Sequence, residues 1–322
     1  MYISKIFEKT NGQIFNIKVS ILLLNYKNSE DTIRCLKTIE ELNYKNFEVL
    51  IFDNASEQDQ VFLLKNYLKN MNNPKNIRYY YSKYNLGFSK ANNYLVEKSN
   101  GELIWFLNND TIVEKNSLKV LVKIYKKYQN AGTVSCTIPF MQKPEIVWSA
   151  GCIYYRGISL VRSIGKFQSI KKWSKKDTLL KVDFNTGCAL LIKRTIFDKV
   201  GRFNEEYFVY NEDLELGLKI KELGLDNIVL LCPLVLHDES ASTKGKRSSE
   251  KEKWSYTKIY LMLKTRLIFL SKNGLSIKNI LISLSFLFIH FFLFFYYSKE
   301  KNILCLGKIF RRAINDSRLF KT

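Results

Sequence analysis

Short apolar runs alternate with amphipathic stretches along the first 130 residues. The runs at 19–24, 47–52, 77–81 and 103–107 suit strands, and the stretches at 31–42, 58–69, 89–99 and 117–128 show the three-to-four-residue spacing of helices. Strands and helices that alternate in this way are typical of a parallel sheet with right-handed helical crossovers. The pattern therefore predicts an α/β unit of the nucleotide-binding type.

The apolar run at 103–107 stops abruptly on three polar side chains, Asn108, Asn109 and Asp110. Ligands of parallel sheets gather at the carboxyl ends of strands. A carboxylate and two amides there can take a hard cation and a polar substrate, so we predict a metal-diphosphate site. A single carboxylate is a weak cation site by itself. Other predicted strands also end on or near polar residues, namely Asn25, Asp53, Asn54 and Asn85.

The pattern becomes irregular from Ala131 to Asp183, where prolines, glycines and a lysine cluster interrupt it. We interpret this segment as a lid or an acceptor-side insertion. A strand then follows Asn185, a helix at 214–223 is capped by Gly224, and an apolar strand at 228–236 ends at His237. Residues 1–18 form an N-terminal extension, and 19–243 form one domain with halves at 19–130 and 131–243.

The tail at 244–322 has a different composition. Residues 241–322 carry 17 Lys or Arg against 4 Asp or Glu, in a chain whose net charge is +21. The basic residues accompany long apolar runs, which favours an anionic membrane surface and no nucleic-acid partner. The segments at 254–272 and 303–320 have the spacing of basic amphipathic helices, and 280–297 is apolar.

The apolar segment at 280–297 is long enough to span a bilayer only just. Lysines and arginines flank it on both sides, so no positive-inside asymmetry supports a crossing. We expect an in-plane or re-entrant element, and the alternative is a helix buried in a homodimer interface. The cysteines lie far apart and the amino terminus lacks a signal-peptide core, which together favour the cytoplasmic face of the membrane.

A series of motifs in order resembles the family 2 inverting glycosyltransferases, particularly the rhamnosyltransferase-like branch that builds cell-surface polysaccharides. The motifs run from about Val19 to Thr243: Val19-Ser-Ile-Leu-Leu-Leu-Asn-Tyr, Phe52-Asp-Asn-Ala-Ser, Asn85-Leu-Gly-Phe with Asn92-Asn93, Phe106-Leu-Asn-Asn-Asp-Thr, Gly187-Cys-Ala-Leu-Leu-Ile, Val200-Gly-Arg-Phe-Asn-Glu, and Tyr210-Asn-Glu-Asp-Leu-Glu-Leu with His237. The resemblance implies a GT-A fold, with a mainly parallel mixed sheet flanked by helices.

The resemblance also implies a donor site for a nucleoside-diphosphate sugar. Asp53 is similar to the carboxylate that reads the pyrimidine base, although a turn role satisfies the same sequence. Further donor contacts are expected from Asn25, Asn54, Asn85, Gly87, Asn93, Asn108 and Asn109.

The resemblance assigns the metal, Mn²⁺ or Mg²⁺, to Asp110 and His237. Asn108 departs from the family's Asp-x-Asp motif at its first position, so it adds no charge and ligates the ion or contacts the donor. A cap or turn role for Asp110, and a hydrogen-bonded loop role for His237, are the structural alternatives.

Glu212 and Asp213 are the predicted catalytic residues, at the start of a helix. Capping is an alternative for one of them, since a carboxylate is favoured at a helix N-terminus. The resemblance makes Asp213 the general base that removes the acceptor proton.

The leading function is a metal-dependent inverting transfer, perhaps from dTDP-rhamnose, to a polyprenyl-diphosphate-linked or polysaccharide acceptor. The alternatives are a sugar-phosphate nucleotidylyltransferase-like enzyme and a non-catalytic membrane scaffold. The former usually needs a Gly-rich basic loop after its first strand, which Asn25-Tyr-Lys-Asn-Ser does not resemble.

Overall fold

The computed structural model describes residues 2–4, 16–71, 76–175, 178–239, 248–272, 281, 285 and 303–317. Its first half confirms the predicted alternation, with small shifts of the helix boundaries. The elements are β2 (Val19–Asn25), α1 (Ser29–Glu40), β3 (Phe47–Asn54), α2 (Gln58–Lys69), β4 (Ile77–Ser82), α3 (Gly87–Lys98) and β5 (Leu103–Asn108). Strands β5, β2, β3 and β4 lie side by side in that order and pair in parallel.

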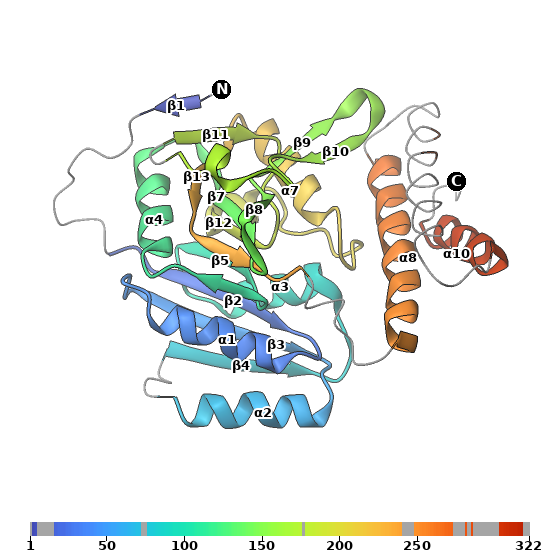
Figure 1. Cartoon of the computed structure of the whole chain (residues 1–322), viewed down its shortest axis with the longest axis horizontal. Coiled ribbons are helices and arrows are strands. Elements are labelled where there is room, and N and C mark those ends of the chain that lie inside the picture. Colours follow the sequence, from blue (N-terminus) through green and yellow to red (C-terminus); the bar gives the residue numbers. More distant parts are fainter. Residues whose placement is uncertain are drawn as a thin grey trace.

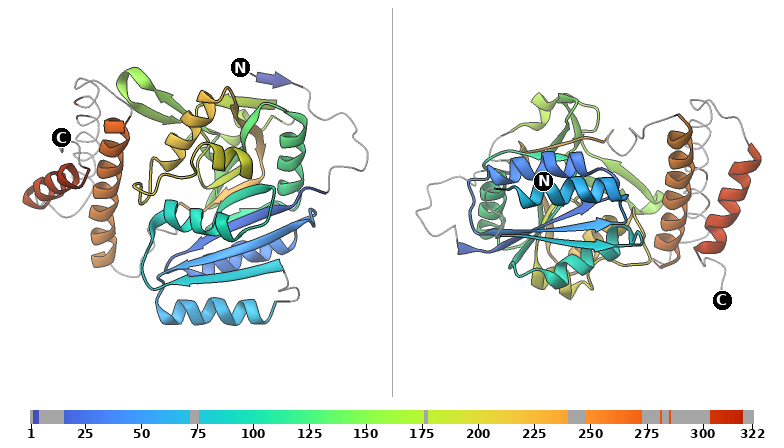
Figure 2. Two further views of the ribbon diagram at one scale, coloured as in Figure 1. Left: turned by 180° about the vertical axis from the view of Figure 1, so that it is seen from behind. Right: turned by 90° about the horizontal axis from the view of Figure 1, so that it is seen from below.

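Successive residues of these strands point to opposite faces of the sheet, and both faces are covered. Ile21, Leu23 and Trp105 join the cluster beneath α1, α2 and α4 (Ser117–Lys127), whereas Leu22 and Phe106 join the cluster beneath α3. Figure 2 shows these helices on the two sides of the strands. Burial on both faces explains why the strands are continuous apolar runs.

The second half turns the sheet into a mixed one. The full order is β1-β11-β13-β7-β12-β5-β2-β3-β4, and β12 is antiparallel to both of its neighbours. The added elements in chain order are β6 (Thr111–Val113), β7 (Ala131–Phe140), β8 (Lys143–Ser149), β9 (Cys152–Tyr155), η3 (Arg156–Ile158), β10 (Leu160–Ser163), α5 (Ile170–Trp173), β11 (Thr178–Val182), β12 (Ala189–Lys193), α6 (Arg194–Lys199), α7 (Glu212–Glu222), β13 (Asp226–Pro233) and β14 (Val235–His237). Gly224 ends α7 with a φ of +75°, as expected for a C-terminal cap.

The interpretation of 131–183 as a lid or insertion is wrong for its first part. Strand β7 is a central, buried strand that lies between β12 and β13. Its polar side chains are buried because they have partners: Ser135 Oγ donates to the Ala189 carbonyl at 2.7 Å, and Thr133 Oγ1 donates to Asn227 Oδ1 at 2.7 Å. Hydroxyls that are satisfied in this way are tolerated in a core, but they break the apolar run that identifies a strand in the sequence.

Part of the expected N-terminal extension joins the sheet. Strand β1 (Tyr2–Ser4) pairs antiparallel with β11, so this part of the extension is an edge strand.

Two described helices of the tail pack beside the domain (Figure 1): α8 (Ser248–Lys272) and α10 (Ile303–Asp316). In α8 the apolar side chains Leu263, Leu267, Phe269 and Leu270 are buried against protein. Arg266, expected on a polar surface, is also buried, because it bonds to the domain. The four apolar side chains named above are therefore covered by the chain itself and are not available to a membrane.

The remaining tail predictions are tested only in part. Apart from positions 281 and 285, the segment at 280–297 lies outside the described residues, as do residues 318–320 of the last predicted helix. Within the part of the chain that the structure describes, no helix is long and apolar enough to cross a membrane.

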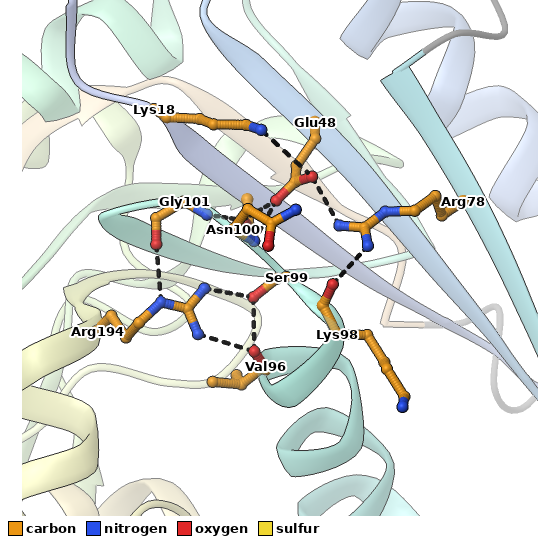
Figure 3. A network of polar contacts seen from close by, with 10 residues as sticks. Lys18, Glu48, Arg78, Val96, Lys98, Ser99, Asn100, Gly101 and Arg194 are labelled. Atoms are coloured by element: carbon orange, nitrogen blue, oxygen red, sulfur yellow. Dashed lines mark hydrogen bonds and ion pairs between the residues drawn. The ribbon is translucent and has the colours of Figure 1, made fainter.

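A buried polar network ties the strands together at their amino ends (Figure 3). Glu48 accepts hydrogen bonds from Ser20 Oγ at 2.7 Å, from the Asn100 amide at 2.5 Å and from Arg78 Nη2 at 2.7 Å. Arg194 donates to the backbone around Ser99 in the same view. Burial alone raises the pKa of Glu48, but these hydrogen bonds and Arg78 hold that pKa below its ordinary value.

We expect Glu48→Ala to lower the free energy of unfolding by about 2–3 kcal/mol, because it leaves buried donors without a charged acceptor. Urea unfolding measures this change. The stabilisation is present above the ordinary pKa of about 4.3 and is lost as the pH falls through the lower folded pKa. Glu41→Ala is the control, since Glu41 and Lys115 form an exposed ion pair worth less than about 1 kcal/mol. Equal losses in the two variants would contradict the role of the network.

Candidate functional site

The carboxyl ends of β2, β3 and β5 bring the predicted strand-end residues together. In the sheet register Asn25 lies opposite Asp53, and Leu24 lies opposite Asn108. A chain of hydrogen bonds follows from this register. Asn109 Nδ2 donates to Thr32 Oγ1 at 2.8 Å, Thr32 Oγ1 donates to Asn25 Oδ1 at 2.7 Å, and Asn25 Nδ2 donates to Asp53 Oδ2 at 2.7 Å.

Asp53 is fully buried, and both of its oxygens accept hydrogen bonds from the protein. The Ser56 amide donates to Oδ1 at 2.8 Å, which is the turn role considered as the alternative. A carboxylate oxygen can accept more than one hydrogen bond. Contact between Asp53 and the pyrimidine base of the donor therefore stays a prediction. It requires the pyrimidine to reach a carboxylate oxygen that already accepts a hydrogen bond from the protein.

Asn54, Asn85 and Gly87 shape the loop that leads into α3. Asn54 Oδ1 accepts from the Leu86 amide at 2.7 Å, and Asn85 Oδ1 accepts from the Gly87 amide at 2.9 Å. Gly87 has a φ of +75°, and a Cβ there would lie 2.3 Å from the Phe208 carbonyl oxygen. These residues hold the loop, and contact with a donor stays a prediction for each of them.

Asn93 lies on α3 and bonds to a different segment. Its Nδ2 donates to the Phe203 carbonyl at 2.8 Å, and its Oδ1 accepts from the Phe203 amide at 3.2 Å. Both ends of the amide thus bind the loop that precedes α7. The sequence did not indicate this role, and a donor contact by Asn93 stays a prediction.

Asp110 and His237 meet where β6 pairs with β14. His237 lies opposite Thr111 in this pair, and its Nε2 is 3.2 Å from Asp110 Oδ1. The His237 ring packs edge-on against Trp148, with 4.3 Å between the ring centroids. Two residues that are 127 positions apart in the sequence are thus held side by side on paired strands.

The chemistry of this pair fits a divalent cation. Both residues are buried, and Asp110 Oδ1 faces His237 Nε2 at 3.2 Å. A carboxylate oxygen and an imidazole nitrogen that lie side by side are ligand types that divalent cations accept. Burial lowers the pKa of His237, but Cys188 and Asp110 outweigh it and raise that pKa well above its ordinary value. The described residues contain no cluster of three or more His, Cys, Asp or Glu side chains that could hold an ion. Asp110 and His237 are thus two candidate ligands, and metal binding by them stays a prediction.

Glu212 and Asp213 open α7, and their environments differ. Asp213 Oδ1 accepts from the Leu214 amide at 2.8 Å, and Oδ2 accepts from the Gly187 amide at 3.4 Å. Burial raises the pKa of Asp213 to about 6. Burial, and then the neighbouring Asp213, raise the pKa of Glu212 well above its ordinary value. Asp213 can therefore exchange a proton near neutral pH, whereas the raised pKa of Glu212 favours its protonated form.

A backbone bridge joins the two halves of the site. Gly187 donates to Asp213, and the carbonyl of the next residue, Cys188, accepts from the Asn108 amide at 2.8 Å. The start of α7 is thereby linked to the end of β5, two residues before Asp110. This bridge depends on β12 lying antiparallel beside β5.

Several residues that shape this region were missed in the sequence. Thr32 and Ser56 complete the chain of hydrogen bonds, and Arg34 forms ion pairs with Asp31 at 2.7 Å and with Asp238 at 3.5 Å. A hydroxyl or a guanidinium on an amphipathic helix carries no signal that separates it from a solvated one. Only the spacing of Thr32 after the polar end of β2 could have drawn attention to it.

The chain is similar in sequence to a known protein family and to several of its members. Residues 20–201 match the family model described as glycosyl transferase family 2. The chain is 26% identical over 251 residues, 74% of its length, to the O-antigen biosynthesis protein RfbC of Myxococcus xanthus. It is 37% identical over 62 residues, 19% of its length, to an N-acetylglucosaminyl-diphospho-decaprenol L-rhamnosyltransferase of Mycobacterium tuberculosis. These alignments span 18% and 20% of the two relatives.

A solved structure shares the fold. The mannosyltransferase PcManGT from Pyrobaculum calidifontis, in complex with GDP-Man and Mn²⁺, superposes with a TM-score of 0.54 at 16% identity. The superposition covers 81% of this chain and 66% of that protein. This similarity confirms the predicted GT-A architecture of the α/β domain.

Proposed function

The chain belongs to glycosyl transferase family 2, and from this premise we propose that it transfers a sugar from a nucleoside-diphosphate sugar to a hydroxyl acceptor in glycan synthesis. The observation that carries the proposal is the bridge from Asp213 through Gly187 and Cys188 to the end of β5. It holds an ionisable carboxylate close to the strand end that carries Asp110. A base and a diphosphate site on one edge are what glycosyl transfer needs.

The transfer proceeds with inversion. Asp213, in its ionised form, accepts the proton of the acceptor hydroxyl as that oxygen attacks the anomeric carbon. The bond to the leaving diphosphate breaks on the opposite side of the sugar. Burial and the neighbouring Asp213 raise the pKa of Glu212 well above its ordinary value, which favours its protonated form and leaves the role of base to Asp213.

Asp110 and His237 would hold a divalent cation, Mn²⁺ or Mg²⁺. When bound, the cation would supply positive charge that stabilises the leaving diphosphate. The buried position of both side chains, with Asp110 Oδ1 3.2 Å from His237 Nε2, supports this assignment, and the bound Mn²⁺ in PcManGT is consistent with it. Asn108 and Asn109 contact the ion or the sugar from the same turn.

The finer substrate proposal is L-rhamnose from dTDP-rhamnose, transferred to a polyprenyl-diphosphate-linked acceptor. The partial similarity to the mycobacterial rhamnosyltransferase supports it. Such an acceptor places the enzyme at the cytoplasmic face of the membrane, where the excess of lysine and arginine after residue 240 favours an anionic surface. A homodimer formed through the tail stays a prediction.

A donor screen tests the proposal. We expect a nucleoside-diphosphate sugar with Mn²⁺ to raise the melting temperature, because a ligand that binds only the folded state stabilises it. Addition of an acceptor should then release nucleoside diphosphate. Asp110→Ala is the control, which should abolish the Mn²⁺-dependent part of the shift.

Release of pyrophosphate from a nucleoside triphosphate and a sugar phosphate would instead indicate a nucleotidylyltransferase. Donor binding without turnover on any acceptor would indicate a scaffold.

A further inference from the structure

The loop that precedes the proposed base adopts an unfavourable backbone conformation. Tyr210 and Asn211 have φ values of 73° and 68°, so two consecutive non-glycine residues are left-handed immediately before α7. This conformation is unfavourable for non-glycine residues, and it persists only where the surroundings fix it. The surroundings of this loop therefore determine where α7 begins, and with it the place of Asp213.

Helix α8 supplies those surroundings through two consecutive residues. Asn211 Nδ2 donates to Thr265 Oγ1 at 3.0 Å, and Asn211 Oδ1 accepts from Arg266 Nη1 at 3.4 Å. Both ends of the Asn211 amide are thus engaged by one helix. This helix lies beyond residues 20–201, the part of the chain that matches the family model.

Arg266 also reaches a third segment. Its Nη2 donates to the carbonyl oxygen of Ser159 and, at 3.0 Å, to Ser159 Oγ, in the turn between β9 and β10. The guanidinium carbon lies 5.5 Å from the centre of the Tyr154 ring and 5.3 Å from that of Phe269. Figure 1 shows α8 standing beside this hairpin. One side chain therefore joins α8, the hairpin and the loop before α7.

Docking of α8 does not require these polar groups. Ile268, Phe269 and Leu270 already pack with Tyr207 and Leu214 in one buried apolar cluster. A buried guanidinium is costly to desolvate, and Arg266 forms no ion pair in the described part of the chain. An apolar residue at this position would stabilise the packing more. The polar contacts of Arg266 therefore indicate that they fix the geometry of the neighbouring loop.

We propose that Thr265 and Arg266 are positioning residues that lock Asn211 in its left-handed conformation and thereby hold Asp213 against the Gly187 amide. This inference rests on the proposed function, in which Asp213 is the base. Helix α8 then belongs to the catalytic unit, although it comes from the tail.

Thr265→Val and Arg266→Gln test the proposal in the full-length chain. Thr265→Val keeps the volume and removes one partner of Asn211. Arg266→Gln removes the other partner and the link to Ser159. We expect kcat to fall about tenfold to a hundredfold in each, as for a small misplacement of a reacting group, while KM and the donor Kd stay within about twofold. Arg266→Lys, which keeps one donor at this position, should recover part of kcat.

Arg312→Gln is the matched control, because Arg312 is an exposed arginine of α10 that stacks on Tyr260 of α8 without reaching the loop. It should leave kcat unchanged. A wild-type kcat in folded Thr265→Val would overturn the proposal, as would an equal loss in Arg312→Gln. Where Arg266→Gln does not fold, Thr265→Val decides. Asp213→Asn, assayed in parallel, separates the two claims: turnover in that variant would refute the base itself and not its positioning.

Discussion

Replacement of Asp213 by Asn is expected to lower kcat by about 10²- to 10⁴-fold, the usual contribution of a general base. The amide keeps the shape of the side chain, and its one oxygen can still accept from the Leu214 amide, whereas the bond from the Gly187 amide is lost. The proposed donor contacts lie on other residues, so the donor Kd should not change. Steady-state kinetics and a separate donor-binding titration measure the two quantities. A variant that keeps its turnover would remove Asp213 from the reaction.

The pH dependence of kcat provides an independent test of Asp213 as the general base. Because burial raises the pKa of Asp213 to about 6, the base is ionised above that pH and protonated below it. We therefore expect kcat of the wild type to fall about tenfold per pH unit below about 6. In Asp213→Asn this acid limb should be absent from the residual activity.

Glu212→Gln is the matched control for both measurements. Burial and the neighbouring Asp213 raise the pKa of Glu212 well above its ordinary value, which favours its protonated form. The amide resembles that form, so it should keep kcat within about tenfold and leave the acid limb in place. A large loss in Glu212→Gln with little effect of Asp213→Asn would reverse the assignment of the base.

Removal of the metal site is expected to have the second large effect. Asp110→Ala deletes the carboxylate of the pair and leaves the proposed metal site without its charged ligand. We expect kcat to fall about 10²- to 10³-fold, a loss comparable to that of one preorganised charge-stabilising group. Treatment of the wild type with EDTA should produce a similar loss that added Mn²⁺ restores, whereas Asp110→Ala should not recover at the same Mn²⁺ concentration.

Asn108→Asp offers a gain-of-function counterpart. It adds a second carboxylate two residues from Asp110 and restores the first position of the Asp-x-Asp motif. A site with more negative charge binds a divalent cation more tightly, so half-maximal activity should need less Mn²⁺. Activity of the wild type that is unaffected by EDTA, together with unaltered kinetics of Asp110→Ala, would contradict the metal role.

Much of the fold could be predicted from apolar runs alone. The strands β2, β3 and β5 are buried on both faces, so almost every position is apolar and the run stands out. Strand β7 could not be recognised in this way, because its Thr and Ser hydroxyls are satisfied by distant partners such as Asn227 and Ala189. Those partners exist only after β12 and β13 have joined the sheet.

The tail shows the same limit more strongly. The periodicity of 254–272 predicted a basic amphipathic helix, and a helix is present. Which surface it covers depends on the neighbours that it meets. Arg266 lies outside the apolar stripe of the predicted helix, but its hydrogen bonds run to Ser159 in the domain. A sequence pattern gives the face of a helix and leaves its partner undetermined.

The sequence by itself determined the order of the elements and the polar residues at the strand ends, because alternation of strand and helix, together with the carboxyl-end rule, is local information. Only the tertiary structure shows which of those residues lie next to one another. Pairing of β6 with β14 sets Asp110 beside His237, and the antiparallel β12 carries the backbone that joins Asp213 to Asn108. Contacts between residues so far apart depend on strand register and helix docking, which no local pattern encodes.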